Sequence, residues 1–219
     1  MPTLPSGSMV VFASPNNPVG NVLSKARFRS LLSKYPDVFW VADEAYCEFS
    51  DEPYTPLLSE FSNFIIIRTF SKTMGAAGVR LGYILGAGNV INLLKKPRVP
   101  FLINQFTLAA VTEVLSNPSM AKVFDQIVKN AIEERKRLEV ALINLETKLS
   151  FKIKTSQANF LLAKWNDTAA STKAYQFLLK DGILVRNVAG APGLAGCLRI
   201  SVGTVEQNNQ LIKAFKNMD

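Results

Sequence analysis

Short apolar runs, each followed by turn residues, mark the first part of the chain. They cover Met9–Phe12, Val38–Ala42, Phe64–Ile67 and Arg80–Gly86. Short runs rich in Val, Ile and Phe, bounded by Pro, Gly, Asn or Asp, are typical of buried strands. We therefore predict four strands in this part of the chain.

A helix is expected between the first two of these runs. Phe28, Leu31 and Leu32 recur at helical spacing after Ser24, which is a favourable N-cap residue, so the helix should cover Lys25–Lys34. The order of strand, helix and strand is typical of βαβ units, in which a mostly parallel sheet is buried on both faces.

Helical periodicity dominates the middle of the chain. We predict helices over Asn89–Leu94 and Asn104–Leu115, and a long amphipathic helix from Ser119 to about Leu149. The side chains expected to point inward are Phe106, Ala109, Ala110 and Val114 in the second helix, and Val123, Ile127, Ile132, Leu138 and Leu142 in the third.

The last part of the chain has the pattern of a small α/β unit. We expect strands at Phe151–Ile153, Asn159–Ala163, Ile183–Val185 and Cys197–Val202, and helices at Ala169–Lys180 and Val205–Met218. Thr204 and Glu206 fit a cap and a first-turn acid of the closing helix. The expected domains are residues 1–118, a bridging helix at 119–149, and residues 150–219.

Composition narrows the classes of function. With 219 residues and 48% apolar content, the chain can bury a substantial core. The net charge of +8 is scattered, with only a modest concentration at Lys95, Lys96 and Arg98, so we expect a small anionic substrate and no nucleic acid. We expect no signal peptide, because residues 1–5 have no basic n-region, and no membrane span, because no apolar run is long enough.

Cysteine and histidine content restrict the chemistry further. Cys47 and Cys197 lack metal-ligand spacing and are expected to be reduced thiols of a cytoplasmic protein. The chain has no histidine, which excludes His-based triads and most zinc sites, so we expect no metal. Any catalysis must use Lys, Arg, Asp, Tyr or a cofactor.

Lys72 is the strongest candidate for a catalytic residue. It follows the apolar run Phe64–Ile67, and the carboxyl ends of strands are where α/β sheets bind ligands. A half-buried lysine beside Arg80 would have its ammonium form disfavoured, and the neutral amine is the form that attacks a carbonyl carbon. An ordinary exposed loop lysine is the alternative.

Other polar residues stand where apolar runs end. Asp43 follows Val38–Ala42, and Asn17 lies in the turn Ser14–Gly20, where two prolines and Gly20 fix the backbone. Each could be no more than a turn residue. Arg199 stands among apolar neighbours, where a guanidinium requires an anion.

Four segments, in this order, resemble the fold-type I pyridoxal-phosphate aminotransferases. They are Ser14–Gly20 (SPNNPVG), Asp43–Tyr46 (DEAY), Ser71–Lys72 with Arg80, and Leu198–Gly203 (LRISVG). The likeness is closest to histidinol-phosphate aminotransferase and extends from Met9 onward. It implies a three-layer α/β/α large-domain core with a mostly parallel sheet, and a smaller α/β carboxy-terminal domain.

The resemblance also implies how pyridoxal 5'-phosphate is held. Lys72 would bind its aldehyde and move the proton in catalysis, and Asp43 would pair with its ring nitrogen. The other cofactor-binding residues would be Asn17 and Tyr46 at the phenolic oxygen, and Thr69, Ser71 and Arg80 at the phosphate. Ser14 and Val19 depart from the residues that many relatives have there.

For the substrate, the resemblance implies a clamp on the α-carboxylate by Arg199, with Arg186 at a distal phosphate. Asn17 would also contact the substrate, and Asn159 could support the carboxylate site. The partners would be an amino acid or amino phosphate, a 2-oxo acid and a second copy in a homodimer. An amino-acid biosynthetic enzyme of the cytoplasm is the expectation.

Two other hypotheses remain open. Threonine-phosphate decarboxylase shares these motifs and the cofactor but catalyses another reaction. The third hypothesis is a folded, non-catalytic remnant, because the part of the family that precedes the Asn-Pro turn has no counterpart in residues 1–8. With that part missing, we expect exposed sheet edges and self-association.

Overall fold

The computed structural model describes residues 3–73, 75–97 and 102–218, and the chain forms two compact units. Unit 1 consists of Met1–Pro15 and Val22–Val128, and unit 2 of Asn16–Asn21 and Lys129–Asp219. The chain thus leaves unit 1 for one short turn and returns to it. The domain bounds expected from the sequence stay a prediction.

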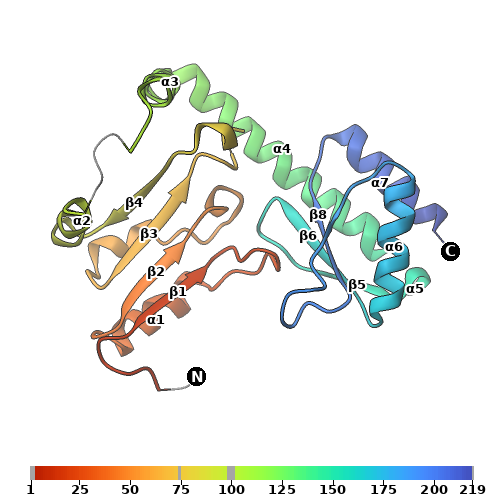
Figure 1. Cartoon of the computed structure of the whole chain (residues 1–219), viewed down its shortest axis with the longest axis horizontal. Helices are drawn as coiled ribbons and strands as arrows, with labels where there is room; N and C mark the ends of the chain where they lie inside the picture. Colours follow the sequence, from red (N-terminus) through yellow and green to blue (C-terminus); the bar gives the residue numbers. More distant parts are fainter. Residues whose placement is uncertain (1–2, 74, 98–101, 219) are drawn as a thin grey trace. The chain divides into compact units, whose positions relative to one another are not determined.

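Unit 1 contains the four predicted strands in one sheet (Figure 1). These are β1 (Met9–Ala13), β2 (Phe39–Asp43), β3 (Phe64–Thr69) and β4 (Gly82–Gly86), in the order β1-β2-β3-β4. The first three strands are parallel and β4 is antiparallel to β3. A mostly parallel sheet is therefore confirmed, but β4 begins after Arg80, which has φ 52° and caps a short 3-10 helix.

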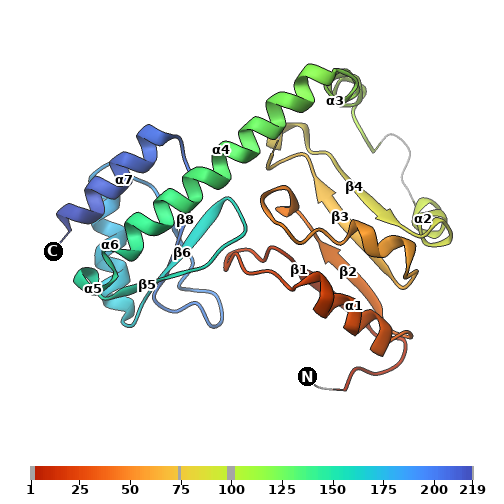
Figure 2. The same cartoon turned by 180° about the vertical axis from the view of Figure 1, so that it is seen from behind.

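Helix α1 (Lys25–Lys34) covers one face of this sheet, as Figure 2 shows. The hydroxyl of Ser24 accepts a hydrogen bond from the backbone N–H of Arg27, so the predicted N-cap is confirmed. The buried face of α1 packs into a cluster of aromatic and aliphatic side chains that includes Phe28, Leu32, Trp40, Tyr54 and Phe64.

The opposite face of the sheet is open at its β1 edge. The side chains of Met9 and Val11 are 63% and 66% exposed. The prediction of a sheet buried on both faces is therefore wrong at β1, because alternate side chains of a strand point to opposite faces and α1 covers only one of them.

Two more helices of unit 1 are α2 (Gly88–Lys95) and α3 (Gln105–Ser116). The predicted inner face of α3 is wrong. Phe106 is 87% exposed, Ala109 and Ala110 are exposed, and the buried residue is Val111. In a helix with apolar residues on several sides, the spacing alone does not decide which side is covered.

Helix α4 (Pro118–Ile143) contributes residues to both units, and the short α5 (Glu146–Leu149) follows it. Leu138 and Leu142 are buried as predicted, whereas Val123 and Ile127 are exposed. The helix predicted to reach Leu149 is thus interrupted at 144–145. Over the described ranges, no helix combines the length and apolar character needed to cross a membrane.

Unit 2 contains an antiparallel sheet with the order β5-β6-β8-β7. Its strands are β5 (Phe151–Lys154), β6 (Phe160–Trp165), β7 (Arg186–Asn187) and β8 (Cys197–Ser201). The predicted strand at Ile183–Val185 is wrong, because pairing with β8 begins only at Arg186.

Helices α6 (Thr168–Lys180) and α7 (Val205–Asn217) complete unit 2. One core unites residues of α4, α6 and α7 with alternate residues of β6, namely Leu161, Ala163 and Trp165. Thr204 and Gln207 form a capping box at the start of α7, and Glu206 lies in its first turn, so both predicted features are confirmed.

The turn 16–21 packs against unit 2 through Gly20. The carbonyl of Gly20 accepts a hydrogen bond from the backbone N–H of Gln157 at 2.8 Å, and Gly20 has φ 81°. A Cβ atom at this position would lie 2.2 Å from Oγ and 2.6 Å from Cβ of Ser156. The close approach and the backbone angle both require glycine.

We expect Gly20→Ala to lower the free energy of unfolding of unit 2 by about 2–4 kcal/mol. The backbone strain of alanine at positive φ and the overlap of its Cβ atom with Ser156 both contribute. Gly193→Ala is the matched control: Gly193 has φ 76° with open space around it, so only about 1–2 kcal/mol is expected. Urea unfolding followed by Trp165 fluorescence in a Trp40→Phe background measures both. Equal losses in the two variants would contradict the packing argument.

Candidate active site

The carboxyl ends of β2 and β3 lie side by side in unit 1. Asp43 pairs with Ile67 across the sheet, and the backbone N–H of Glu44 donates to the carbonyl of Ile67 at 2.9 Å. The segment that carries Lys72 begins where β3 ends, at Thr69. The strand register therefore places Asp43 and the segment that carries Lys72 at the same edge of the sheet.

Lys72 lies against Tyr46. The Nζ atom of Lys72 is 5.3 Å from the centroid of the Tyr46 ring, a distance at which an ammonium group is attracted to the ring face. Tyr46 is buried, but Lys72 is exposed. The prediction of a half-buried Lys72 is thus wrong, because this side chain lies over one aromatic face with solvent around the rest.

Asp43 organises the turn that positions Tyr46. Its Oδ1 atom accepts a hydrogen bond from the backbone N–H of Ala45 at 2.9 Å. This is the local turn that short acidic side chains favour. Asp43 is half-buried, and a carboxylate that accepts one bond keeps acceptor capacity for a further donor.

Thr69 and Ser71 form a pair of hydroxyl groups just before Lys72. The Thr69 hydroxyl donates to Oγ of Ser71 at 2.9 Å, and the backbone N–H of Ser71 donates to Oγ1 of Thr69 at 3.1 Å. Among the described residues, no contact joins Arg80 to Thr69 or Ser71. It is exposed, and its guanidinium donates to the carbonyl of Ala77 at 2.9 Å.

A buried ion pair, which the sequence analysis did not find, lies behind this edge. Arg68 donates to Oε2 of Glu44 through Nε at 2.9 Å and Nη2 at 2.7 Å. The other oxygen of Glu44 accepts from the backbone N–H of Tyr54 at 2.6 Å. Glu44 is 1% exposed, and its carboxylate holds Arg68 and the backbone of Tyr54. In the sequence, the only sign of this ion pair is Arg68 itself, an arginine that follows directly on an apolar run.

Further buried groups surround this edge. The hydroxyl of Tyr54 bonds to Oγ of Ser14 at 2.8 Å and to the carbonyl of Leu23, and burial raises the pKa of Tyr54 to about 12. Burial also raises the pKa of the Cys47 thiol and of the Glu48 carboxyl group above their usual values. These groups make the turn after β2 a packed support for Tyr46.

The remaining predicted residues lie in unit 2. Arg199 donates through Nη1 to Oδ1 of Asn17 at 2.9 Å, and its guanidinium lies 5.1 Å from the centroid of the Phe160 ring. Arg186 is the direct cross-strand partner of Arg199. Paired residues share one face of a sheet, so the two cations stand together, on the face away from the Leu161 and Trp165 core.

A cavity of about 350 Å³ opens beside this pair. Asn17, Pro18 and Arg186 contribute to its lining, together with the loop at 187–194. Two arginines and an asparagine amide form a donor set suited to a carboxylate or a phosphate. Asn159 has a structural contact, because its carbonyl accepts from the backbone N–H of Val202 at 2.9 Å.

Both cysteines are buried and free. In the part of the chain that the structure describes, no group of three or more Cys, Asp and Glu residues is arranged to hold a metal ion. The chemistry available at these positions is that of an amine, a phenol, carboxylates, hydroxyls and guanidinium groups.

The chain is similar to known histidinol-phosphate aminotransferases. It is 38% identical over 211 residues to the one from Parabacteroides distasonis, covering 96% of this chain and 59% of the relative. It is 40% identical over 205 residues to histidinol-phosphate aminotransferase 1 from Carboxydothermus hydrogenoformans, covering 94% and 55%. The chain thus spans somewhat under three fifths of the length of these relatives.

Solved structures show the same fold. A decarboxylase from Sulfurospirillum multivorans matches with a TM-score of 0.83 and 30% identity, covering 95% of this chain and 61% of that one. Histidinol-phosphate aminotransferase from Clostridium acetobutylicum matches with a TM-score of 0.81 and 26% identity, covering 95% and 63%.

A third match is histidinol-phosphate aminotransferase from Sinorhizobium meliloti in complex with pyridoxal-5'-phosphate, with a TM-score of 0.80, 25% identity and coverage of 96% and 58%. The family described as aminotransferase class I and II matches residues 4–215, nearly the whole sequence. The chain therefore belongs to the class I and II aminotransferases.

Proposed function

We propose that this chain carries the catalytic residues of a pyridoxal-phosphate-dependent aminotransferase of the histidinol-phosphate type. It would transfer an amino group between an amino acid or amino phosphate and a 2-oxo acid. The observation that carries the proposal is the arrangement at the ends of β2 and β3, where the Lys72 amine lies over the Tyr46 ring and Tyr46 belongs to the turn that begins at Asp43. The similarity to named histidinol-phosphate aminotransferases supports it.

The side chains of unit 1 fit pyridoxal 5'-phosphate in their chemistry. Asp43 has a carboxylate with spare acceptor capacity for a protonated ring nitrogen, and Tyr46 has a phenol that can donate to the cofactor's phenolic oxygen. The Ser71 hydroxyl offers a donor for the phosphate. To join it, the Thr69 hydroxyl would have to turn away from Ser71, and Arg80 would have to leave the Ala77 carbonyl. When bound, the cofactor supplies an electron sink for the bond that breaks at the substrate's Cα.

Lys72 would act on the proton of the substrate. Its Nζ atom, once neutral, would take the proton from the substrate's Cα and deliver it to C4′ of the cofactor, first as a general base and then as a general acid. Contact with the aromatic face of Tyr46 restricts where this flexible amine can lie. Such positioning is worth about 10²–10⁴-fold in rate.

Unit 2 would recognise the substrate through its anionic groups. Arg199, which is held by Asn17 and by the Phe160 ring, would bind the α-carboxylate with its planar guanidinium. Arg186, at the 350 Å³ cavity, is suited to a distal phosphate. Asn17 would serve both ligands, with its amide donating to the cofactor's phenolic oxygen or to the substrate.

Decarboxylation is a second candidate, favoured by the similarity to the decarboxylase from Sulfurospirillum multivorans. The same residues would serve, but the bond to the carboxylate would break in place of the Cα–H bond. Carbon dioxide release from an amino-acid phosphate, with no requirement for a 2-oxo acid, would identify this reaction. Amino transfer that depends on a 2-oxo acid would identify the first. We propose a homodimer in both cases.

Incubation with pyridoxal 5'-phosphate followed by borohydride reduction tests the proposal. We expect the cofactor to be fixed on the peptide that contains Lys72, at one equivalent per chain, and to be lost in Lys72→Ala. Lys34 is an internal control, because its Nζ also lies 5.3 Å from an aromatic ring, that of Tyr35, but it stands at the end of α1 and is not one of the predicted cofactor residues.

Two outcomes would count against the proposal. Fixation on Lys34 and Lys72 alike would show only general lysine reactivity. Absence of fixation in a chain shown to be folded by circular dichroism would favour the non-catalytic remnant.

A further inference from the structure

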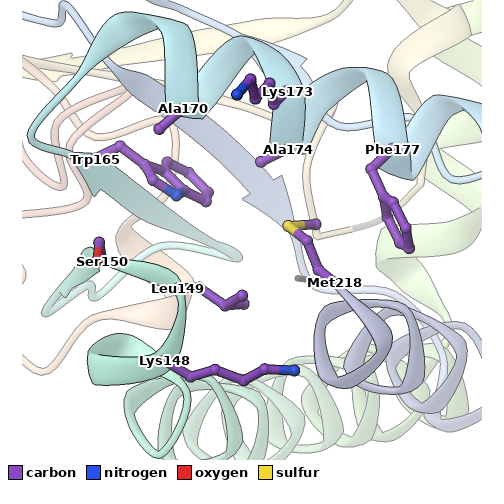
Figure 3. A pocket seen from close by; sticks show the side chains of 9 residues that line it. All are labelled: Lys148, Leu149, Ser150, Trp165, Ala170, Lys173, Ala174, Phe177 and Met218. Atoms are coloured by element: carbon purple, nitrogen blue, oxygen red, sulfur yellow. The ribbon is translucent and has the colours of Figure 1, made fainter.

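We propose that unit 2 has a second ligand site, on the helix-covered side of its sheet, for a small anion with a flat apolar body. The site is the α5–α6–α7 cavity, of about 460 Å³. Figure 3 shows the side chains that line it, among them Leu149, Trp165, Phe177 and Met218, with Lys148 and Lys173 at its margin. Cavities that bind small ligands measure about 300–1,000 Å³, so the volume is sufficient.

The cavity is distinct from the arginine pair of the same unit. Trp165 alternates with Phe160 and Leu162 along β6 and belongs with Leu161 and Ala163 to the core beneath the helices. Arg199 pairs with Leu162, on the other face of the sheet. A ligand in the α5–α6–α7 cavity would therefore touch none of the residues assigned to substrate binding.

Trp165 gives the cavity an unused hydrogen-bond donor. The side chain is 2% exposed and stacks on Phe151 at 5.0 Å between ring centroids. None of the hydrogen bonds among the described residues involves its indole nitrogen, which Figure 3 shows on the ring edge turned towards Leu149 and Ser150. This N–H is accessible from the cavity and can donate a hydrogen bond to an acceptor on a ligand.

The positive charges of Lys148 and Lys173 at the margin of the cavity favour a negatively charged ligand. Lys148 is fixed by donation from Nζ to the carbonyl of Lys216 at 2.9 Å, which leaves two of its three N–H bonds for another acceptor. Lys173 is exposed on α6. The nearby acid Glu146 is already used by Lys152 and by the backbone N–H of Ile153. Figure 3 shows Lys173 and Lys148 on opposite margins of the apolar lining, so a cation at either margin fits the carboxylate of an aromatic or cyclic ligand.

Fluorescence of Trp165 provides the test, because the chain has only two tryptophans. In full-length Trp40→Phe protein, titration with hydrocinnamate should change the Trp165 emission saturably, with a roughly millimolar Kd for a ligand of this size. The neutral hydrocinnamamide should bind more weakly. Each of Lys148→Ala and Lys173→Ala should weaken hydrocinnamate binding by up to about fivefold, as loss of one exposed charge pair does.

Two further variants make the test specific. Lys180→Ala removes another exposed lysine of α6. Lys180 does not line the cavity, so this change should leave the Kd for hydrocinnamate unchanged. Ala170→Phe fills the cavity and should abolish the signal, with far-ultraviolet circular dichroism as the check that it folds. Equal affinity for acid and amide, equal effects of Lys180→Ala and Lys173→Ala, or no saturable change would each overturn the proposal.

Discussion

Replacing Lys72 with alanine is expected to lower the rate of amino transfer by about 10²- to 10⁴-fold, the range that a positioned proton-transfer group contributes. The amine is also the group assigned to hold the cofactor, so the loss should fall at the upper end. Lys72→Arg should not restore the rate, because a guanidinium stays protonated at any accessible pH. The measurement is 2-oxo acid-dependent amino transfer at saturating cofactor.

Lys34→Ala is the matched control for this experiment. Lys34 and Lys72 have the same distance from Nζ to a tyrosine ring, 5.3 Å, but Lys34 lies at the end of α1. Its replacement should leave the rate unchanged. If Lys72→Ala lowers the rate by less than tenfold, the loss is smaller than a proton-transfer group accounts for. That result would show that Lys72 does not act in the mechanism.

Replacing Arg68 with methionine is expected to destabilise unit 1 by about 3–5 kcal/mol, because it leaves the Glu44 carboxylate buried without its cation. Two of the three hydrogen bonds described for the Glu44 carboxylate come from Arg68, and the Glu44 side chain is 1% exposed. Urea unfolding monitored by Trp40 fluorescence in a Trp165→Phe background measures the loss.

Two variants separate this effect from general loss of charge. Arg29→Met removes the partner of Glu60 in a pair whose side chains are largely exposed, and should cost less than about 1 kcal/mol. The double variant Glu44→Gln with Arg68→Met should be more stable than Arg68→Met alone, because no buried charge remains. A loss in Arg68→Met no larger than that in Arg29→Met would contradict the argument.

The sequence predicted the elements whose signals are local. The helix Lys25–Lys34 has a capping serine and three apolar residues at helical spacing, and its predicted bounds agree with the structure. The strands that end in Asp43 and Thr69 begin with continuous apolar runs. For the same reason the candidate residues at the ends of β2 and β3 could be selected before their positions were known.

Features that depend on distant partners could not be predicted in this way. The pairing of Arg68 with Glu44 joins residues 24 positions apart, and nothing near Arg68 in the sequence identifies its partner. The exposure of Phe106 and of Lys72 depends on what covers a surface, which periodicity does not report. The strand at Arg186–Asn187 is only two residues long and exists through its pairing with β8.

The turn that contains Asn17 has a consequence for how the polypeptide matures. Asn17 and Arg199 are 182 residues apart, although both belong to unit 2. At typical translation speeds the ribosome needs roughly 10 to 40 s to make the intervening chain, so this contact can form only after that delay. The turn 16–21 can take its place only after β8 has left the ribosome. Until then Asn17 lacks Arg199, and the anion-binding face of unit 2 is incomplete.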